Sequence, residues 1–230
     1  MNYLAICMFV ASYFSTYEKE CVDAISFVNT NTEIRTNLND VLNGTNNAAL
    51  AISVVLPEIS QYSHLENIVQ TRLLYVTYLQ CGQGNFSVGY FQMKPSFAQK
   101  IESLIQRDKK LSNDFGDLII KEQSDYDIRY ERLTRLNNLK WELRYLEAFF
   151  ILAERRIRGW PHSELPLFKL KYLSTFYNGG LDLSLKDVEK LLTCAQFPHL
   201  SSKSFNYSSC AIEFYERICK CWGIKVNMQG

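Results

Sequence analysis

Apolar positions recur along much of this chain at steps of three and four residues, the spacing of one face of an α-helix. The clearest such stretch, residues 128–158, predicts one long helix. Its apolar stripe consists of Leu136, Leu139, Leu143, Leu146 and Phe150. Stripes of this kind are far more often core than coiled-coil seams, so we expect this one to be buried within the chain.

Other apolar or amphipathic segments predict further helices at residues 17–28, 48–56, 65–78, 95–107, 167–176, 188–194 and 209–222. Pro95 suits the first turn of its helix, whereas Pro57 predicts a kink or a helix end. Ser184 and Asp187 resemble a capping box. Residues 86–93 are short, aromatic and glycine-punctuated, which favours a strand or a turn. Because strands and helices do not alternate, we expect a mainly α single domain with a minimal β element.

The chain begins with an apolar stretch at residues 4–14. Its length suits the apolar region of a signal peptide and is too short to span a bilayer. We therefore expect a signal peptide within residues 1–20, a domain at 21–230, and export to the periplasm or cell envelope. The alternative is a buried N-terminal helix.

Composition narrows the function classes. Of 230 residues 47% are hydrophobic, enough for a sizeable core, and the net charge of +1 gives no sign of a nucleic-acid partner. Seven cysteines at irregular spacing predict mainly buried thiols with at most one bridge. The histidines are scattered, so we expect neither a metal nor a cofactor. Oligomeric state is not indicated.

Glu58 is the candidate for acid–base chemistry. Eight of the nine residues at 48–56 are apolar, and Ile59 follows Glu58. Desolvation raises the pKa of a carboxyl group, and a protonated carboxyl can donate its proton to a glycosidic oxygen. The alternative is a solvated residue at the end of a helix.

Two motifs follow Glu58 along the chain. Gly89-Tyr90-Phe91-Gln92 precedes Pro95-Ser96, and Tyr177-Asn178-Gly179-Gly180 comes later. In this order the three elements resemble the soluble lytic transglycosylases of the lysozyme-like superfamily. Those enzymes carry a catalytic Glu at the end of a buried helix, then G-L-M-Q-x-x-P-[ST], then A-Y-N-A-G. The resemblance spans about residues 48–182, and the overall pattern is also similar to exported Bacteroidetes-type members of the superfamily.

The resemblance implies a lysozyme-like fold and cleavage of the β-1,4 MurNAc-GlcNAc bond in the glycan strands of peptidoglycan. Glu58 would protonate the leaving oxygen and then act as base on the sugar's own 6-hydroxyl, giving a 1,6-anhydro product. Gln92 would hydrogen-bond the glycan, and Ser87 would help to orient it. Tyr177 would contact Glu58 or the sugar, and Asn178 would fix its loop.

Gly89 and Gly179 are expected to be structural turn residues. A plain alternative for Tyr177 and Asn178 is a turn that ends a helix, since Asn and Gly readily adopt left-handed conformations. Gly89 has a similar alternative as the turn between a strand and a helix.

The chain also departs from the family pattern. Ile59 stands where the family usually has Ser, and Ser60 comes next; the S-x-G-A stretch is contracted to Ser87-Val88-Gly89, about 30 residues after Glu58. A hydrolytic lysozyme using Glu58 and water therefore stays open. So does a non-catalytic glycan-binding or scaffold module on the same fold. An unrelated helical interaction protein would instead show no convergence of the motif residues.

Overall fold

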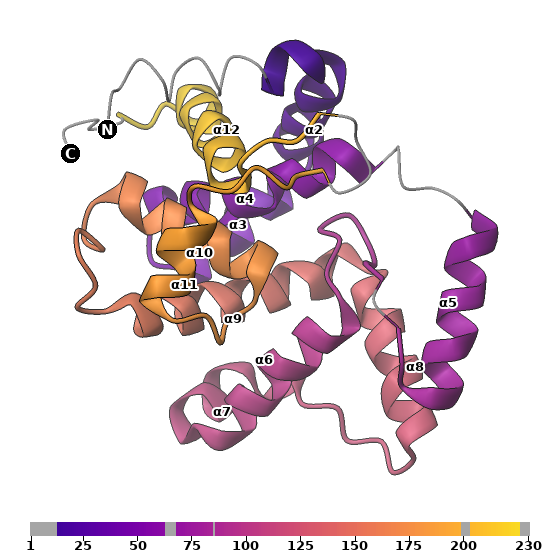
Figure 1. The fold of residues 1–230 in the computed structure, drawn as a ribbon. Helices are drawn as coiled ribbons and strands as arrows, with labels where there is room; N and C mark the ends of the chain where they lie inside the picture. The colour runs from indigo at the N-terminus through magenta and orange to yellow at the C-terminus, as the bar shows by residue number, and fades with distance from the viewer. Residues whose placement is uncertain (1–12, 63–67, 85, 199–202, 226–230) are drawn as a thin grey trace. The chain divides into compact units, whose positions relative to one another are not determined.

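The computed structural model describes residues 13–62, 68–84, 86–198 and 203–225 (Figure 1). The described chain is mainly helical, which confirms the predicted class. Its β structure is limited to two isolated bridges, Val88 with Met93 and Phe197 with Phe205. The chain divides into two compact units: unit 1 comprises residues 1–61 and 150–230, and unit 2 comprises residues 62–149. The single domain expected at residues 21–230 stays a prediction.

Unit 1 is organised around one helix, α4, which contacts α2, α3, α10 and α12. Its elements are α2 (Glu18–Thr30), α3 (Thr32–Val41), α4 (Thr45–Gln61), α10 (Pro166–Gly179), α11 (Leu185–Leu191) and α12 (Tyr207–Trp222) (Figure 1). The α9 helix (Leu139–Ile157) contributes its residues from Phe150 onward. Because partners surround α4, an apolar helix without a polar face is stable there.

The α4 helix continues past Pro57 to Gln61, so of the two predicted alternatives the helix end is wrong, and the kink stays a prediction. Proline keeps a helical φ, but it removes the N–H that would bond the carbonyl of Ser53, and its ring crowds that carbonyl. Burial of the surrounding turn offsets that loss. Residues 48–61 are all buried with the single exception of Glu58, which is half-buried. The helix therefore brings one carboxyl group to the edge of an apolar core.

Unit 2 contains α5 (Ile68–Cys81), α6 (Pro95–Arg107), α7 (Lys109–Phe115), the 3-10 helix η2 (Gly116–Leu118), α8 (Asp125–Leu136) and the first part of α9. A buried polar network joins four of these helices. Arg132 donates to both carboxylate oxygens of Glu102, at 2.9 and 2.6 Å. Arg132 also donates to the hydroxyl of Tyr78, and the hydroxyl of Tyr145 donates to Glu102. The hydrogen bonds between these groups offset the free-energy cost of burying the two charges.

The long helix predicted at residues 128–158 is in fact two helices, α8 and α9, separated by Asn137 and Asn138. The side chain of Asn137 donates to the carbonyl of Leu133, and that of Asn138 accepts from the amide of Lys140. The Leu133 carbonyl accepts from both the backbone amide and the side chain of Asn137, and the Asn138 side chain satisfies an amide at the start of α9 that has no partner within that helix. The predicted core stripe is confirmed for Leu136, Leu143, Leu146 and Phe150, and Leu139 is half-buried.

Most of the predicted signal peptide lies outside the described part of the chain, which begins at residue 13. Tyr13 and Phe14 are buried in unit 1, as the alternative of a buried N-terminal helix expects. The hydroxyls of Tyr13 and Ser60 lie 2.8 Å apart. In the described ranges, no helix combines the length and apolar character needed to cross a membrane.

Six cysteines fall within the described residues, and all are free thiols: Cys21, Cys81, Cys194, Cys210, Cys219 and Cys221. Cys21, Cys210 and Cys219 are buried, in line with the expected buried thiols. Burial raises the pKa of Cys21 to about 12, so this thiol stays protonated and behaves as a small apolar group. Cys7 lies outside the described residues.

Candidate functional site

Glu58 and Tyr177 share one neighbour in unit 1, the buried phenol of Tyr207. Tyr207 opens α12, and its hydroxyl donates to the carbonyl of Val54 on α4 at 2.9 Å. Burial raises the pKa of Tyr207 well above its ordinary value, and Glu58 and Tyr177 both raise it further through their charges. The helices that carry Glu58, Tyr177 and Tyr207, which are α4, α10 and α12, all contact one another, so the three residues lie in one region.

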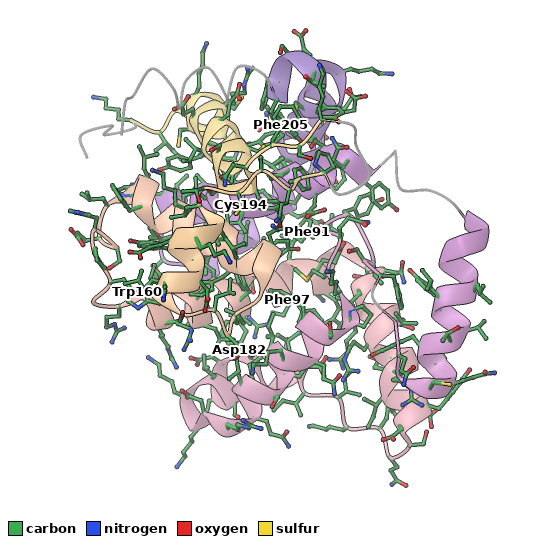
Figure 2. The ribbon with its side chains drawn as sticks, in the orientation of Figure 1. Phe91, Phe97, Trp160, Asp182, Cys194 and Phe205 are labelled. Atoms are coloured by element: carbon green, nitrogen blue, oxygen red, sulfur yellow. The ribbon has the colours of Figure 1, made fainter. Side chains whose placement is uncertain are left out.

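A small pocket lies beside Tyr207 and includes the predicted residue Asn178. Its lining combines polar and apolar side chains from α10, the end of α11, the segment that follows α11, and the start of α12: Thr175, Asn178, Leu191, Cys194, Gln196, Phe197, Asn206, Tyr207 and Ser208. Figure 2 labels Cys194 on this segment. The pocket has a volume of about 20 Å³, the space of about one water molecule, so it is too small for a sugar ring. Its amide and hydroxyl groups can hydrogen-bond a single small polar group such as a hydroxyl.

The side chain of Asn206 links the backbone segments that form one wall of this pocket. Asn206 caps α12 by accepting from the amide of Ser209 at 3.0 Å. Its amide nitrogen donates to the carbonyls of Leu191, Leu192 and Cys194, at 3.1, 3.0 and 2.9 Å. The start of α12 and the end of α11 are therefore joined through one side chain, which fixes the backbone around Tyr207.

The segment from Tyr177 to Gly179 forms the last turn of α10, which runs three residues beyond its predicted end at Phe176. Gly180 caps the helix with a φ of +105°, and its amide donates to Phe176 at 2.7 Å. A Cβ on Gly179 would lie 2.9 Å from the side chain of Leu183, so glycine permits a close approach there. The helix ends at Gly180, so Tyr177 and Asn178 are helical rather than part of a turn, and the prediction of Gly179 as a turn residue is wrong, because Gly179 is the last residue of α10.

The second motif forms a tight turn in unit 2. Val88 and Met93 pair through two backbone hydrogen bonds of 3.0 Å each, and Gly89 to Gln92 close the turn between them. Gly89 has a φ of +74°, and a Cβ there would overlap the carbonyl of Leu136. The position accepts only glycine, which agrees with the predicted structural turn.

The amide nitrogen of Gln92 donates to the carbonyl of Gly89 at 2.6 Å. Gln92 therefore helps to close its own turn, whatever further contact its carbonyl oxygen makes. Ser87 is half-buried between the buried side chains of Phe86 and Val88. Both predicted residues belong to unit 2, whereas Glu58, Tyr177 and Asn178 belong to unit 1. Their action together on one glycan stays a prediction.

Glu142, which was not predicted as a site residue, lies in α9 and contacts this turn. Its carboxylate accepts from the amide of Phe91 at 2.8 Å and from that of Tyr90 at 3.2 Å. Burial raises the pKa of Glu142 to about 8, although the two backbone hydrogen bonds lower it. Glu142 lies three residues after Leu139 and directly before Leu143. A charge on the apolar face of a predicted helix was the signal that could have found it.

Comparison with protein-family models, with curated proteins and with solved structures finds no match to this chain. Within the described residues, no group of three or more His, Cys, Asp or Glu side chains is arranged to hold a metal ion.

Proposed function

We propose that the chain is a lysozyme-like protein of the lytic transglycosylase type, which cleaves the β-1,4 MurNAc-GlcNAc bond of peptidoglycan. One observation carries the proposal. Glu58 is the single partly exposed residue of the buried stretch 48–61, and it shares the neighbour Tyr207 with Tyr177. The first and third motif elements, more than 100 residues apart in sequence, therefore lie in the same region.

The chemistry requires only one carboxyl group. Glu58 donates its proton to the glycosidic oxygen as the bond from that oxygen to the anomeric carbon breaks. The resulting carboxylate then takes the proton of the 6-hydroxyl on the same MurNAc, and the 6-oxygen bonds to the anomeric carbon. The product carries a 1,6-anhydro ring, and Glu58 is again protonated. No water is consumed in this sequence.

The neighbouring residues have distinct roles in the proposal. Tyr177 contacts Glu58 or the sugar, and Asn178 lines the pocket in which a sugar substituent would lie. Tyr207 acts as a positioning residue, because its hydroxyl joins α12 to α4 one turn before Glu58. Ser87 and Gln92 would orient the glycan. Because peptidoglycan lies in the envelope, the proposal includes export, for which the apolar residues 4–14 are the support.

A second candidate is a glycan-binding module without catalysis, and the residues after Glu58 favour it. The family usually has Ser directly after its catalytic Glu, where this chain has Ile59. Ser60 has other partners: its hydroxyl donates to the carbonyl of Pro57 at 2.7 Å and lies 2.8 Å from the hydroxyl of Tyr13. The position directly after Glu58 therefore lacks the serine of the family, and Ser60 does not replace it.

Digestion of purified peptidoglycan sacculi by the purified protein separates these functions. Mass spectrometry of the released fragments should show 1,6-anhydro MurNAc ends. Reducing MurNAc ends would instead indicate hydrolysis by water, a different reaction at the same Glu58. Binding to sacculi without any release of fragments would favour the non-catalytic module. Absence of both binding and release would overturn the proposed function.

A further inference from the structure

The Gly89–Gln92 turn is under backbone strain. The strain lies at Gln92, whose φ of +51° is in a left-handed region that side-chain-bearing residues rarely adopt, whereas Gly89 takes its φ of +74° without strain. Phe91, labelled in Figure 2, is fully buried, whereas Tyr90 is 38% exposed. A strained turn keeps one geometry only if its surroundings hold it there.

Tyr90 presents an aromatic ring at the surface of unit 2. Its ring centroid lies 5.2 Å from that of Tyr62, in a tilted arrangement. Aromatic rings provide a large, rigid contact surface at low entropic cost, and their faces suit the C–H-bearing faces of pyranose rings. The motif position that is Leu in the family pattern is thus an exposed aromatic side chain here.

The carboxyl group of Glu142 holds this turn from the neighbouring helix. Its two oxygens accept the amides of Phe91 and Tyr90 at 2.8 and 3.2 Å, across more than 50 residues of sequence. We propose that Glu142 is a positioning residue of the glycan site, which clamps the Gly89–Gln92 turn so that the ring of Tyr90 stacks on a sugar. This inference rests on the proposed function, because it concerns the same ligand.

The surroundings of Glu142 fit a carboxyl group whose hydrogen-bond partners are the two amides of the turn. It is fully buried, and in the described part of the chain no cationic side chain pairs with it. Nearby cations are engaged elsewhere: Arg132 bonds Glu102, and Arg144 bonds Asp117 and Glu147. The titratable group that faces it from α5 is Tyr75, whose pKa is raised mainly by burial and also by Glu142. Burying a carboxyl group without a paired cation costs free energy, and the two hydrogen bonds from backbone amides offset that cost at Glu142.

The test compares Glu142→Gln with Glu147→Gln. Both side chains are buried carboxyls of α9, but Glu147 bonds Arg144 rather than the turn. In Glu142→Gln one oxygen still accepts from Phe91, and the new NH2 group faces the N–H of Tyr90. Amide hydrogen exchange, followed residue by residue by NMR, should therefore accelerate at Tyr90 about tenfold, the effect of losing one typical hydrogen bond. In wild type the Tyr90 and Phe91 amide shifts should titrate with the carboxyl, and in Glu142→Gln they should not.

Binding to purified sacculi is the second readout. Glu142→Gln should weaken binding at least threefold, and raise KM more than it lowers kcat if the wild type cleaves, whereas Glu147→Gln should match wild type. Equal exchange at Tyr90 in the two variants, or unchanged binding by Glu142→Gln, would overturn the positioning role. If wild type binds sacculi without cutting them, the proposed cleavage fails and the binding comparison still decides the role of Glu142. If wild type does not bind, both proposals fail.

Discussion

At the scale of single residues, Glu58 and Glu142 show what local sequence can and cannot reveal. Glu58 was predicted because its apolar neighbours in sequence are also its neighbours in space along one helix. Glu142 was missed because its partners, the amides of Tyr90 and Phe91, lie more than 50 residues away. Tyr207 was missed for the same reason, since its hydroxyl bonds Val54 across 153 residues. Periodicity reports burial along one element and says nothing about such contacts.

Tyr207→Phe tests the positioning role of Tyr207. Removal of its hydroxyl leaves the carbonyl of Val54 without that bond, so we expect unfolding free energy to fall by about 0.5–1.5 kcal/mol and glycan cleavage to fall with it. Tyr172→Phe is the matched control, because the hydroxyl of Tyr172 also donates to a carbonyl, that of Pro161 at 2.8 Å. Urea titration and cleavage assays measure both variants. Equal loss of activity in the two would contradict a local role at Glu58.

At the scale of elements, the sequence pattern predicted some helix boundaries correctly and missed others. The helix at Pro95–Arg107 and the capping box at Ser184 were predicted correctly, because both are set by residues within one turn. The break at Asn137 was missed because Leu136 and Leu139 keep the helical step of three across it. The helix end at Pro57 was wrong because packing of α4 on all sides outweighs one missing hydrogen bond.

Leu143→Ala tests the core role of the α9 stripe. Leu143 is 2% exposed, so truncation leaves a cavity and should cost about 2–5 kcal/mol of unfolding free energy. Leu139→Ala, at the half-buried position of the same stripe, should cost clearly less. Denaturant unfolding of the two variants gives the comparison. A near-zero loss in Leu143→Ala would show that the stripe is not core.

At the scale of the whole molecule, three buried carboxyls give stability a common pH dependence. Burial raises the pKa of Glu142 to about 8, and those of Glu147 and Glu213 to about 7. The folded chain therefore binds more protons than the unfolded chain between the ordinary carboxyl pKa of about 4.3 and these raised values. Their contribution to the free energy of unfolding falls as pH rises through this window.

Unfolding free energy should consequently decrease from pH 5 to pH 8, in unit 2 through Glu142 and Glu147 and in unit 1 through Glu213. Glu142→Gln cannot ionise at this position, so its decrease should be shallower than that of wild type. Urea titrations at pH 5, 6, 7 and 8 measure both slopes. Stability that rises over this range, or identical slopes in wild type and variant, would contradict the assignment of Glu142 as a buried titrating carboxyl.

The central claim is that Glu58 performs the acid and the base step on a peptidoglycan glycan. The most direct measurement is the rate of 1,6-anhydro fragment release from purified sacculi by wild type, Glu58→Gln and the control Glu189→Gln, which alters an exposed carboxyl of unit 1. Gln keeps the size of Glu but supplies no proton, and a positioned acid or base contributes about 10²–10⁴-fold in rate. We predict a loss at or above the upper part of that range in Glu58→Gln, with unchanged stability and with wild-type rates in Glu189→Gln. Wild-type release of fragments by Glu58→Gln would contradict the account.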